Sequence, residues 1–255
     1  MDSLLNKENA NVLKNLADHI VRFDPATISD HALHTVKMGI ADTIGVTLAG
    51  VNEACTQIMM EIPGVADAPG PCLIIGTKRK VNALDATLVN GISSHALDFD
   101  DFSDVLGGHQ SVPLVPVLFA LAQEYRKTGR DIVNAYTVGF EVEHRFAMAL
   151  HPYHYDKGWH PTATLGIFGT VAAAAHLLGL NQEKTATALA IATSMAAGIK
   201  SNFGTMTKPL HVGHSGRSGL LAVLLAARDF TANHASMEHH QGFFALFNGE
   251  GNFTS

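Results

Sequence analysis

The chain has 255 residues, of which 47% are hydrophobic and 16% charged, a composition that excludes an intrinsically disordered protein. Its net charge of −6 argues against nucleic acid as a general partner, and its two cysteines are too few for a zinc ribbon or a four-cysteine iron–sulfur cluster. The apolar runs are shorter than the roughly 18 to 20 residues of a membrane span, and the amino terminus has no signal-peptide or transit-peptide pattern. We therefore expect a cytoplasmic protein without a membrane partner.

Apolar residues at helical spacing dominate the chain. Ser29 is a natural N-cap for a helix that ends at Gly50, and Asn181 caps another that ends at Gly198. Further helices are predicted over residues 83–97, 113–125, 131–150, 163–180 and 218–230. Only residues 72–81, CLIIGTKRKV, have a strand or hairpin pattern. Because no repeat or linker interrupts the pattern, we expect one all-α domain over residues 1–255.

An aromatic cluster lies near the end of the chain, in the segment FFALF at residues 243–247. Its rings require a cover, because large aromatic side chains bury their surface in folded proteins. Two explanations remain open: the last turn folds back on the core, or a following domain supplies the cover.

Basic side chains precede three of the predicted helices. They are His109; Lys157 and His160, with Thr162 as a cap; and Lys208, His211 and His214, in a ladder that continues to Arg217. Pro209 and Gly213 argue against one continuous helical face across this ladder, so we expect a loop followed by a helix start. Helix N-termini attract anions, and residues 157–228 hold six Lys and Arg against the single acid Glu183. If the three termini converge, they would bind a ligand with two or three carboxylates.

The segment SSHALDFDD, residues 93–101, adds His95, Asp98, Asp100 and Asp101. On a helix, His95 and Asp98 would be one turn apart, as would Asp98 and Asp101. Such a group can orient a histidine or supply a base. Taken alone, however, an acidic segment of this kind is more often a solvated helix end or a weak cation site.

Patterns for other catalytic classes are absent from the sequence. It contains no HExxH zinc motif and no GxSxG serine elbow, and no glycine-rich phosphate loop follows a strand. His211 and His214 lack the acidic partner of a zinc hydrolase. We therefore predict no metal site, and a metal-dependent hydrolase is the least favoured class.

Three motifs in order, SSHALDFDD, GWHPTATLGIFGTVAAAAHLLGL and GTMTKPLHVGHSGRSG, resemble the MmgE/PrpD family, as does ADTIGVTLAG nearer the amino terminus. This family includes 2-methylcitrate dehydratase, cis-aconitate decarboxylase and an iminodisuccinate epimerase. The resemblance implies a large helical domain, a homodimer, and no metal or organic cofactor. It places the active site between that domain and an α+β lid. The lid and the closing C-terminal helices have no counterpart in these 255 residues.

Residue by residue, the resemblance implies catalytic roles for Asp98, His109, His160 and Lys208. We expect Lys208 and His160 to bind substrate carboxylates, His109 to move a proton, and Asp98 to orient His109 or act as its acid–base partner. The remaining residues expected to contact substrate are His211, His214, Arg217, Asp101 and Thr162. Family members often carry threonine after DFDD, where this chain has Phe102 and then Ser103.

The chemistry that the resemblance implies is metal-independent carbon–oxygen lysis of a di- or tricarboxylate, as in 2-methylcitrate dehydratase, by proton abstraction next to a carboxylate. The alternatives within the family are decarboxylation of cis-aconitate and epimerisation of iminodisuccinate. The alternative outside it is a non-catalytic helical fragment that dimerises.

Overall fold

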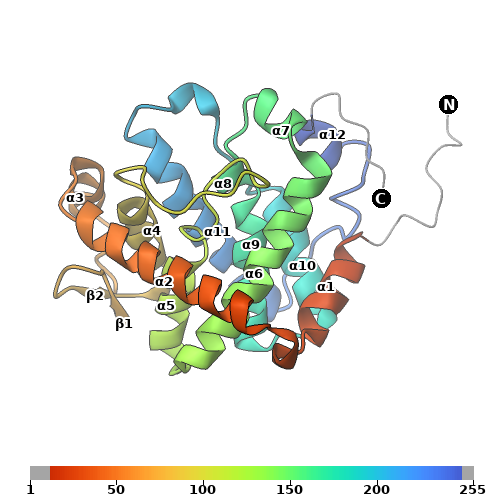
Figure 1. The fold of residues 1–255 in the computed structure, drawn as a ribbon, viewed down its shortest axis with the longest axis horizontal. Coiled ribbons are helices and arrows are strands. Elements are labelled where there is room, and N and C mark those ends of the chain that lie inside the picture. The colour runs from red at the N-terminus through yellow and green to blue at the C-terminus, as the bar shows by residue number, and fades with distance from the viewer. Residues whose placement is uncertain (1–11, 249–255) are drawn as a thin grey trace, which may run out of the picture.

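A computed structural model describes residues 12–248, in which helices predominate and one small sheet lies at an edge of the molecule (Figure 1). In chain order, the elements are α1 (Val12–Arg22), η2 (Pro25–Thr27), α2 (Asp30–Gly50), α3 (Ala54–Glu61), β1 (Pro69–Leu73), β2 (Lys80–Val81), α4 (Ala83–Ser94), α5 (Val115–Tyr125), α6 (Gly129–Leu150), α7 (Tyr153–Asp156), α8 (Pro161–Thr164), α9 (Gly166–Leu178), α10 (Gln182–Thr193), η3 (Lys200–Asn202), α11 (Thr207–Ala227) and α12 (Phe243–Phe247).

Helix α9 lies in the core, where it contacts α5, α6, α8, α10 and α11. Its four consecutive alanines, residues 172–175, are fully buried, and their small side chains let the surrounding helices approach closely. Within the described residues, only Pro161–Leu178 is long and apolar enough to cross a membrane, and 89% of it is buried inside the protein. This burial indicates that the apolar segment packs inside the protein as a core helix.

The predicted caps form at two helix starts. The Ser29 hydroxyl accepts a hydrogen bond from Ala32 N at 3.2 Å, and Asn181 Oδ1 accepts one from Lys184 N at 2.9 Å. Helix α2 ends at Gly50 as expected, but α10 ends at Thr193 rather than at Gly198. Gly198 lies in the loop that follows, where it has a φ of +131° and its carbonyl accepts a hydrogen bond from His160 N at 3.1 Å.

The predicted hairpin is confirmed as an antiparallel pair, β1 and β2, although β1 begins earlier than expected, at Pro69. The Asn90 side chain ties it to α4: its Oδ1 accepts from Ile75 N at 2.9 Å, and its Nδ2 donates to Leu73 O at 3.0 Å. The sheet is therefore an appendage of the helical domain.

The prediction of a loop across the basic ladder is wrong. Helix α11 begins at Thr207, so Lys208, His211, His214 and Arg217 all lie within it. Pro209 is tolerated because it lies in the first turn, where a backbone N–H has no helical partner to lose. Contact with α4 occupies the face of α11 that carries Gly213.

The last helix, α12, folds back on the core, which is the first of the two explanations for its aromatic cluster. Phe243 and Phe247 are buried, with ring centroids 4.9 Å from Phe168 and 4.2 Å from Trp159 respectively. The prediction that the amino terminus is neither a signal peptide nor a transit peptide concerns a segment of which residues 1–11 lie outside the described range.

Candidate active site

The segment that follows α4 supplies the acidic half of the site. His95 is the C-cap of α4, so the helix ends before Asp98, and Asp98 has a left-handed φ of 57°. The predicted helical spacing of His95, Asp98 and Asp101 is therefore wrong. The turn at Asp98 instead folds Asp98 and Asp100 back toward His95.

Asp100 is a buried carboxylate between two imidazoles. His95 Nδ1 lies 2.9 Å from its Oδ2, and His109 Nδ1 lies 3.0 Å from the same oxygen. Burial alone would raise the pKa of Asp100, but the hydrogen bonds and charges of His109 and His95 outweigh burial and lower it. Burial likewise opposes a charged His109, yet the hydrogen bond to Asp100 and its negative charge raise the pKa of His109 above its usual value.

Asp98 and Lys208 connect the acidic segment to α11. The Lys208 ammonium donates to Asp98 Oδ1, and His109 Nε2 lies 3.4 Å from the same oxygen. Lys208 Nζ also lies 4.8 Å from the ring centroid of Phe203. The Asp98 side chain is 50% exposed, whereas those of Lys208 and His109 are 12% exposed. Solvent, and hence a ligand, reaches the group at Asp98.

His160 and His211 form the inner, uncharged part of the site. Their Nδ1 atoms are 3.2 Å apart, and the His160 ring stacks at 5.7 Å on that of His95. Burial, followed by the charges of neighbouring histidines and Lys208, lowers the pKa of His160 to about 2. His160 is therefore neutral at physiological pH, and it can offer a carboxylate a hydrogen bond but no charge. We refer to His95, Asp98, Asp100, His109, His160, Lys208 and His211 as the imidazole cluster.

The remaining candidates on α11 turn away from the cluster. An α-helix advances about 100° per residue, so His214 lies about 120°, and Arg217 about 180°, around the helix from Lys208. His214 is exposed, with its Nε2 3.5 Å from Ser218 Oγ. Three-residue spacing therefore keeps only Lys208 and His211 near the cluster.

Thr162 and Asp101 support the loop that carries His109. Thr162 is not the predicted helix cap, because His160 is the N-cap of α8. The Thr162 hydroxyl oxygen instead accepts a hydrogen bond from the backbone N–H of His109 at 3.0 Å. Asp101 turns from the cluster, and its carboxylate accepts from Gln110 Nε2 at 2.9 Å and from the Ser111 hydroxyl. Thr162 thus holds the backbone of His109 itself, and Asp101 holds the two residues that follow it.

Other polar candidates point elsewhere. Lys157 Nζ donates to Leu246 O at 3.0 Å, so it does not join the cluster. The Phe102 ring packs edge-on against His109 at 5.4 Å. The hydroxyl of Ser103 lies 2.9 Å from His144 Nε2, away from the cluster.

The sequence singled out His95 and Asp100 as members of a polar segment but gave them no catalytic or substrate-binding role, and it did not single out Phe203. His95 and Asp100 stand inside the quoted motif SSHALDFDD, and their i, i+5 separation is the available signal. Phe203 lies in a loop before α11 with no distinguishing pattern. Its ring packs edge-on against His160 at 4.9 Å.

Metal binding was not expected from the sequence, yet the donor atoms of His95, Asp98, Asp100 and His109 lie within 4.8 Å of one another. Nitrogen and carboxylate donors at this spacing suit a divalent transition metal. However, Lys208 places a fixed ammonium on Asp98, and a second cation beside it would be repelled. The arrangement fits an anionic ligand better than a metal ion.

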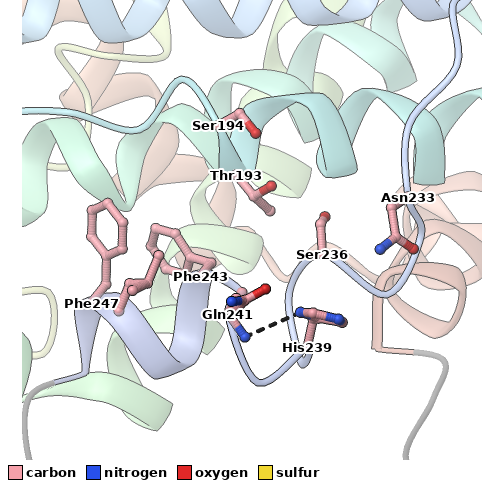
Figure 2. A pocket seen from close by; sticks show the side chains of 10 residues that line it. Thr193, Ser194, Asn233, Ser236, His239, Gln241, Phe243 and Phe247 are labelled. Atoms are coloured by element: carbon pink, nitrogen blue, oxygen red, sulfur yellow. Dashed lines mark hydrogen bonds between the residues drawn. The ribbon is translucent and has the colours of Figure 1, made fainter.

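A hollow of about 320 Å³ lies elsewhere, between the end of α10 and α12 (Figure 2). None of the imidazole cluster lines it. Several of its polar groups are already paired: Gln241 N donates to His239 Nδ1 at 3.1 Å, and Thr193 Oγ1 donates to Ala190 O at 2.7 Å. The chemistry is therefore assigned to the cluster and not to this hollow.

One buried acid should make stability depend on pH. Glu143 is fully buried with no hydrogen-bond partner for either oxygen, and burial, followed by the charge of Asp101, raises its pKa well above the usual value. Between the unfolded pKa of about 4.3 and the raised folded pKa, only the folded state keeps the proton. In that window the free energy of unfolding therefore falls by about 1.4 kcal/mol per pH unit. Glu143→Gln should remove this slope, so that its stability relative to the parent rises as the pH increases through this window.

Urea denaturation at each pH measures this difference. Glu61→Gln, at an exposed glutamate, is the matched control and should show no such trend. A Glu143→Gln difference that stays constant across the range would contradict the assignment of a protonated Glu143.

Comparison with known proteins places the cluster in a wider context. The family model described as MmgE/PrpD N-terminal domain matches residues 14–255. Human cis-aconitate decarboxylase is 31% identical over 226 residues, which cover 86% of this chain and 47% of the human protein. Cis-aconitate decarboxylase of Aspergillus terreus is 28% identical over 232 residues, covering 88% and 47%. A cis-aconitate decarboxylase-like protein of Aspergillus oryzae is 27% identical over 251 residues, covering 95% and 52%. The chain thus spans about half the length of these curated relatives.

Proposed function

Because the chain belongs to the MmgE/PrpD family, we propose that it carries the catalytic cluster of a lyase for a small polycarboxylate, with decarboxylation of cis-aconitate as its reaction. The family resemblance alone had favoured dehydration of a 2-methylcitrate-like compound. The similar curated proteins are named cis-aconitate decarboxylases, and this reverses the order of the two candidates.

One observation carries the proposal: groups from three distant segments meet at Asp98. Lys208 from α11 donates to Asp98 Oδ1, and His109 Nε2 lies 3.4 Å from the same oxygen. The His160 ring stacks on the ring of His95, which lies beside His109. A fixed ammonium, neutral imidazoles and an imidazole with a raised pKa suit an anionic substrate that needs a proton.

In the proposed mechanism, Lys208 binds a substrate carboxylate, which displaces the Asp98 carboxylate from the ammonium. His160 adds a hydrogen bond without charge. Loss of carbon dioxide leaves a carbanion-like centre that is conjugated with the remaining carboxylates, and protonated His109 delivers a proton to it. Before substrate binds, Asp98 stabilises protonated His109 from the Nε2 side. Its displacement leaves the Nε2–H free to reach the substrate, while Asp100 keeps its contact with Nδ1.

The protonation state of His109 also separates the two candidate reactions. Decarboxylation needs a proton donor after carbon dioxide leaves, whereas dehydration begins with proton abstraction by a base. A raised His109 pKa favours the donor form near neutral pH. This supports the decarboxylase proposal, and dehydration remains the second candidate.

The test is carbon dioxide release from cis-aconitate by the purified protein, with 2-methylcitrate and iminodisuccinate assayed in parallel and each reaction repeated with a chelator. We expect carbon dioxide from cis-aconitate with and without the chelator. Turnover of methylcitrate alone would transfer the assignment to dehydration. Loss of activity with the chelator would identify a metal enzyme.

A non-catalytic helical fragment remains the alternative from another class. The aromatic cluster near the chain end had favoured it, but Phe243 and Phe247 are buried in the core. A well-folded protein that neither turns over nor binds any of the three substrates would support this alternative.

A further inference from the structure

Asp100 contacts two imidazoles at once, and this arrangement fixes the position of protons in the site. An ionised carboxylate can only accept hydrogen bonds, so a ring nitrogen that bonds to it must carry hydrogen. Asp100 accepts from His95 Nδ1 at 2.9 Å, and from His109 Nδ1 at 3.0 Å through its carboxylate and at 3.1 Å through its backbone carbonyl. Both rings therefore hold hydrogen on Nδ1.

The opposite nitrogens of the two rings face one point. His109 Nε2 lies 3.4 Å, and His95 Nε2 3.8 Å, from Asp98 Oδ1, with the ring centroids 4.7 Å apart. His95 is completely buried, and its Nε2 has no hydrogen-bond partner. A buried ring nitrogen left unpaired costs free energy, so its orientation needs a cause. The bond from Nδ1 to Asp100 supplies that cause.

We propose that Asp100 is a positioning residue: it keeps hydrogen on Nδ1 of both His95 and His109, and so leaves the two Nε2 atoms side by side, facing the reacting centre. His109 Nε2 is the proton donor of the proposed reaction. His95 Nε2 is an adjacent proton acceptor without a hydrogen-bond partner. The inference rests on the proposed function for its catalytic consequence, but not for its geometry.

The geometry can be tested without substrate, by measuring the nitrogen-15 shifts of the ring nitrogens in labelled protein at a pH where the rings are neutral. His95→Gln and His109→Gln variants assign the signals. We expect both rings to carry hydrogen on Nδ1 and none on Nε2. Hydrogen on Nε2 of either neutral ring would overturn the proposal, whatever the protein's activity.

Asp100→Asn then tests the cause. His95 Nδ1 contacts both carboxylate oxygens, at 3.0 and 2.9 Å, and asparagine turns one of them into a donating nitrogen, so the His95 ring should change tautomer. The His109 ring should keep its tautomer, because its Nδ1 still donates to the backbone carbonyl of residue 100. Asp104→Asn removes the same charge from an exposed position in the same segment and should leave both rings unchanged. If Asp100→Asn folds and leaves both tautomers as in the parent, Asp100 does not position them. If it does not fold, the shifts of the parent protein decide.

Turnover gives the catalytic readout. Asp100→Asn should lower kcat on the order of 100-fold with little change in KM, because His109 loses the carboxylate whose hydrogen bond and charge help it to hold the proton that it donates. Correct tautomers in a protein that turns over none of the substrates would contradict the proposed function and leave the positioning role intact. Parent-like turnover in Asp100→Asn would show that the positioning has no catalytic consequence.

Discussion

Replacing His109 with alanine is expected to lower the turnover of cis-aconitate by roughly 100- to 10,000-fold, the usual contribution of a positioned acid or base. His109 contacts Asp98 through Nε2 and Asp100 through Nδ1, so alanine removes the proton donor and breaks the connection between the two carboxylates. Its backbone N–H still donates to Thr162, so the loop should keep its path. Single-turnover release of carbon dioxide measures the chemical step directly.

The matched control for this variant is His34→Ala, which removes an exposed imidazole from α2 and should leave turnover unchanged. Unfolding midpoints of both variants separate a loss of chemistry from a loss of fold. Parent-like turnover in His109→Ala would remove His109 from the mechanism. A large loss of stability in that variant would instead assign His109 a structural role.

Local patterns predicted most of the fold. Ser29 and Asn181 cap helices because the side chain and the backbone N–H that it accepts from are three residues apart in sequence. The ladder on α11 was misinterpreted because Pro209 and Gly213 lower local helix propensity, whereas their effect depends on distant context. A first-turn position tolerates the proline, and close contact with α4 requires the glycine.

The site could be predicted only in part, for a similar reason. Motif resemblance singled out Asp98, His109, His160 and Lys208, and the structure brings them together. It could not show that Asp100 rather than Asp101 faces the histidines, because that choice depends on the left-handed turn at Asp98.

The contact between α4 and α11 is the structural condition for the whole cluster, because His95 is the C-cap of α4 and Lys208 lies in the first turn of α11. The helices touch through glycines: a Cβ on Gly213 would lie 2.4 Å from Leu88 O and 2.7 Å from Ile92 Cγ1. A carbonyl oxygen cannot move aside as a flexible side chain can. Gly213→Ala should therefore push the helices apart and lower the free energy of unfolding by about 1 to 3 kcal/mol.

The same displacement should reduce turnover, since it moves Lys208 relative to Asp98. Gly45→Ala is the matched control: Gly45 lies within α2 with open space around its Cβ position. There alanine should raise the free energy of unfolding by up to about 1 kcal/mol through helix propensity, with turnover unchanged. Urea denaturation and carbon dioxide release on both variants make the comparison. If Gly213→Ala were as stable and as active as the parent, the spacing of α4 and α11 would not control the geometry of the site.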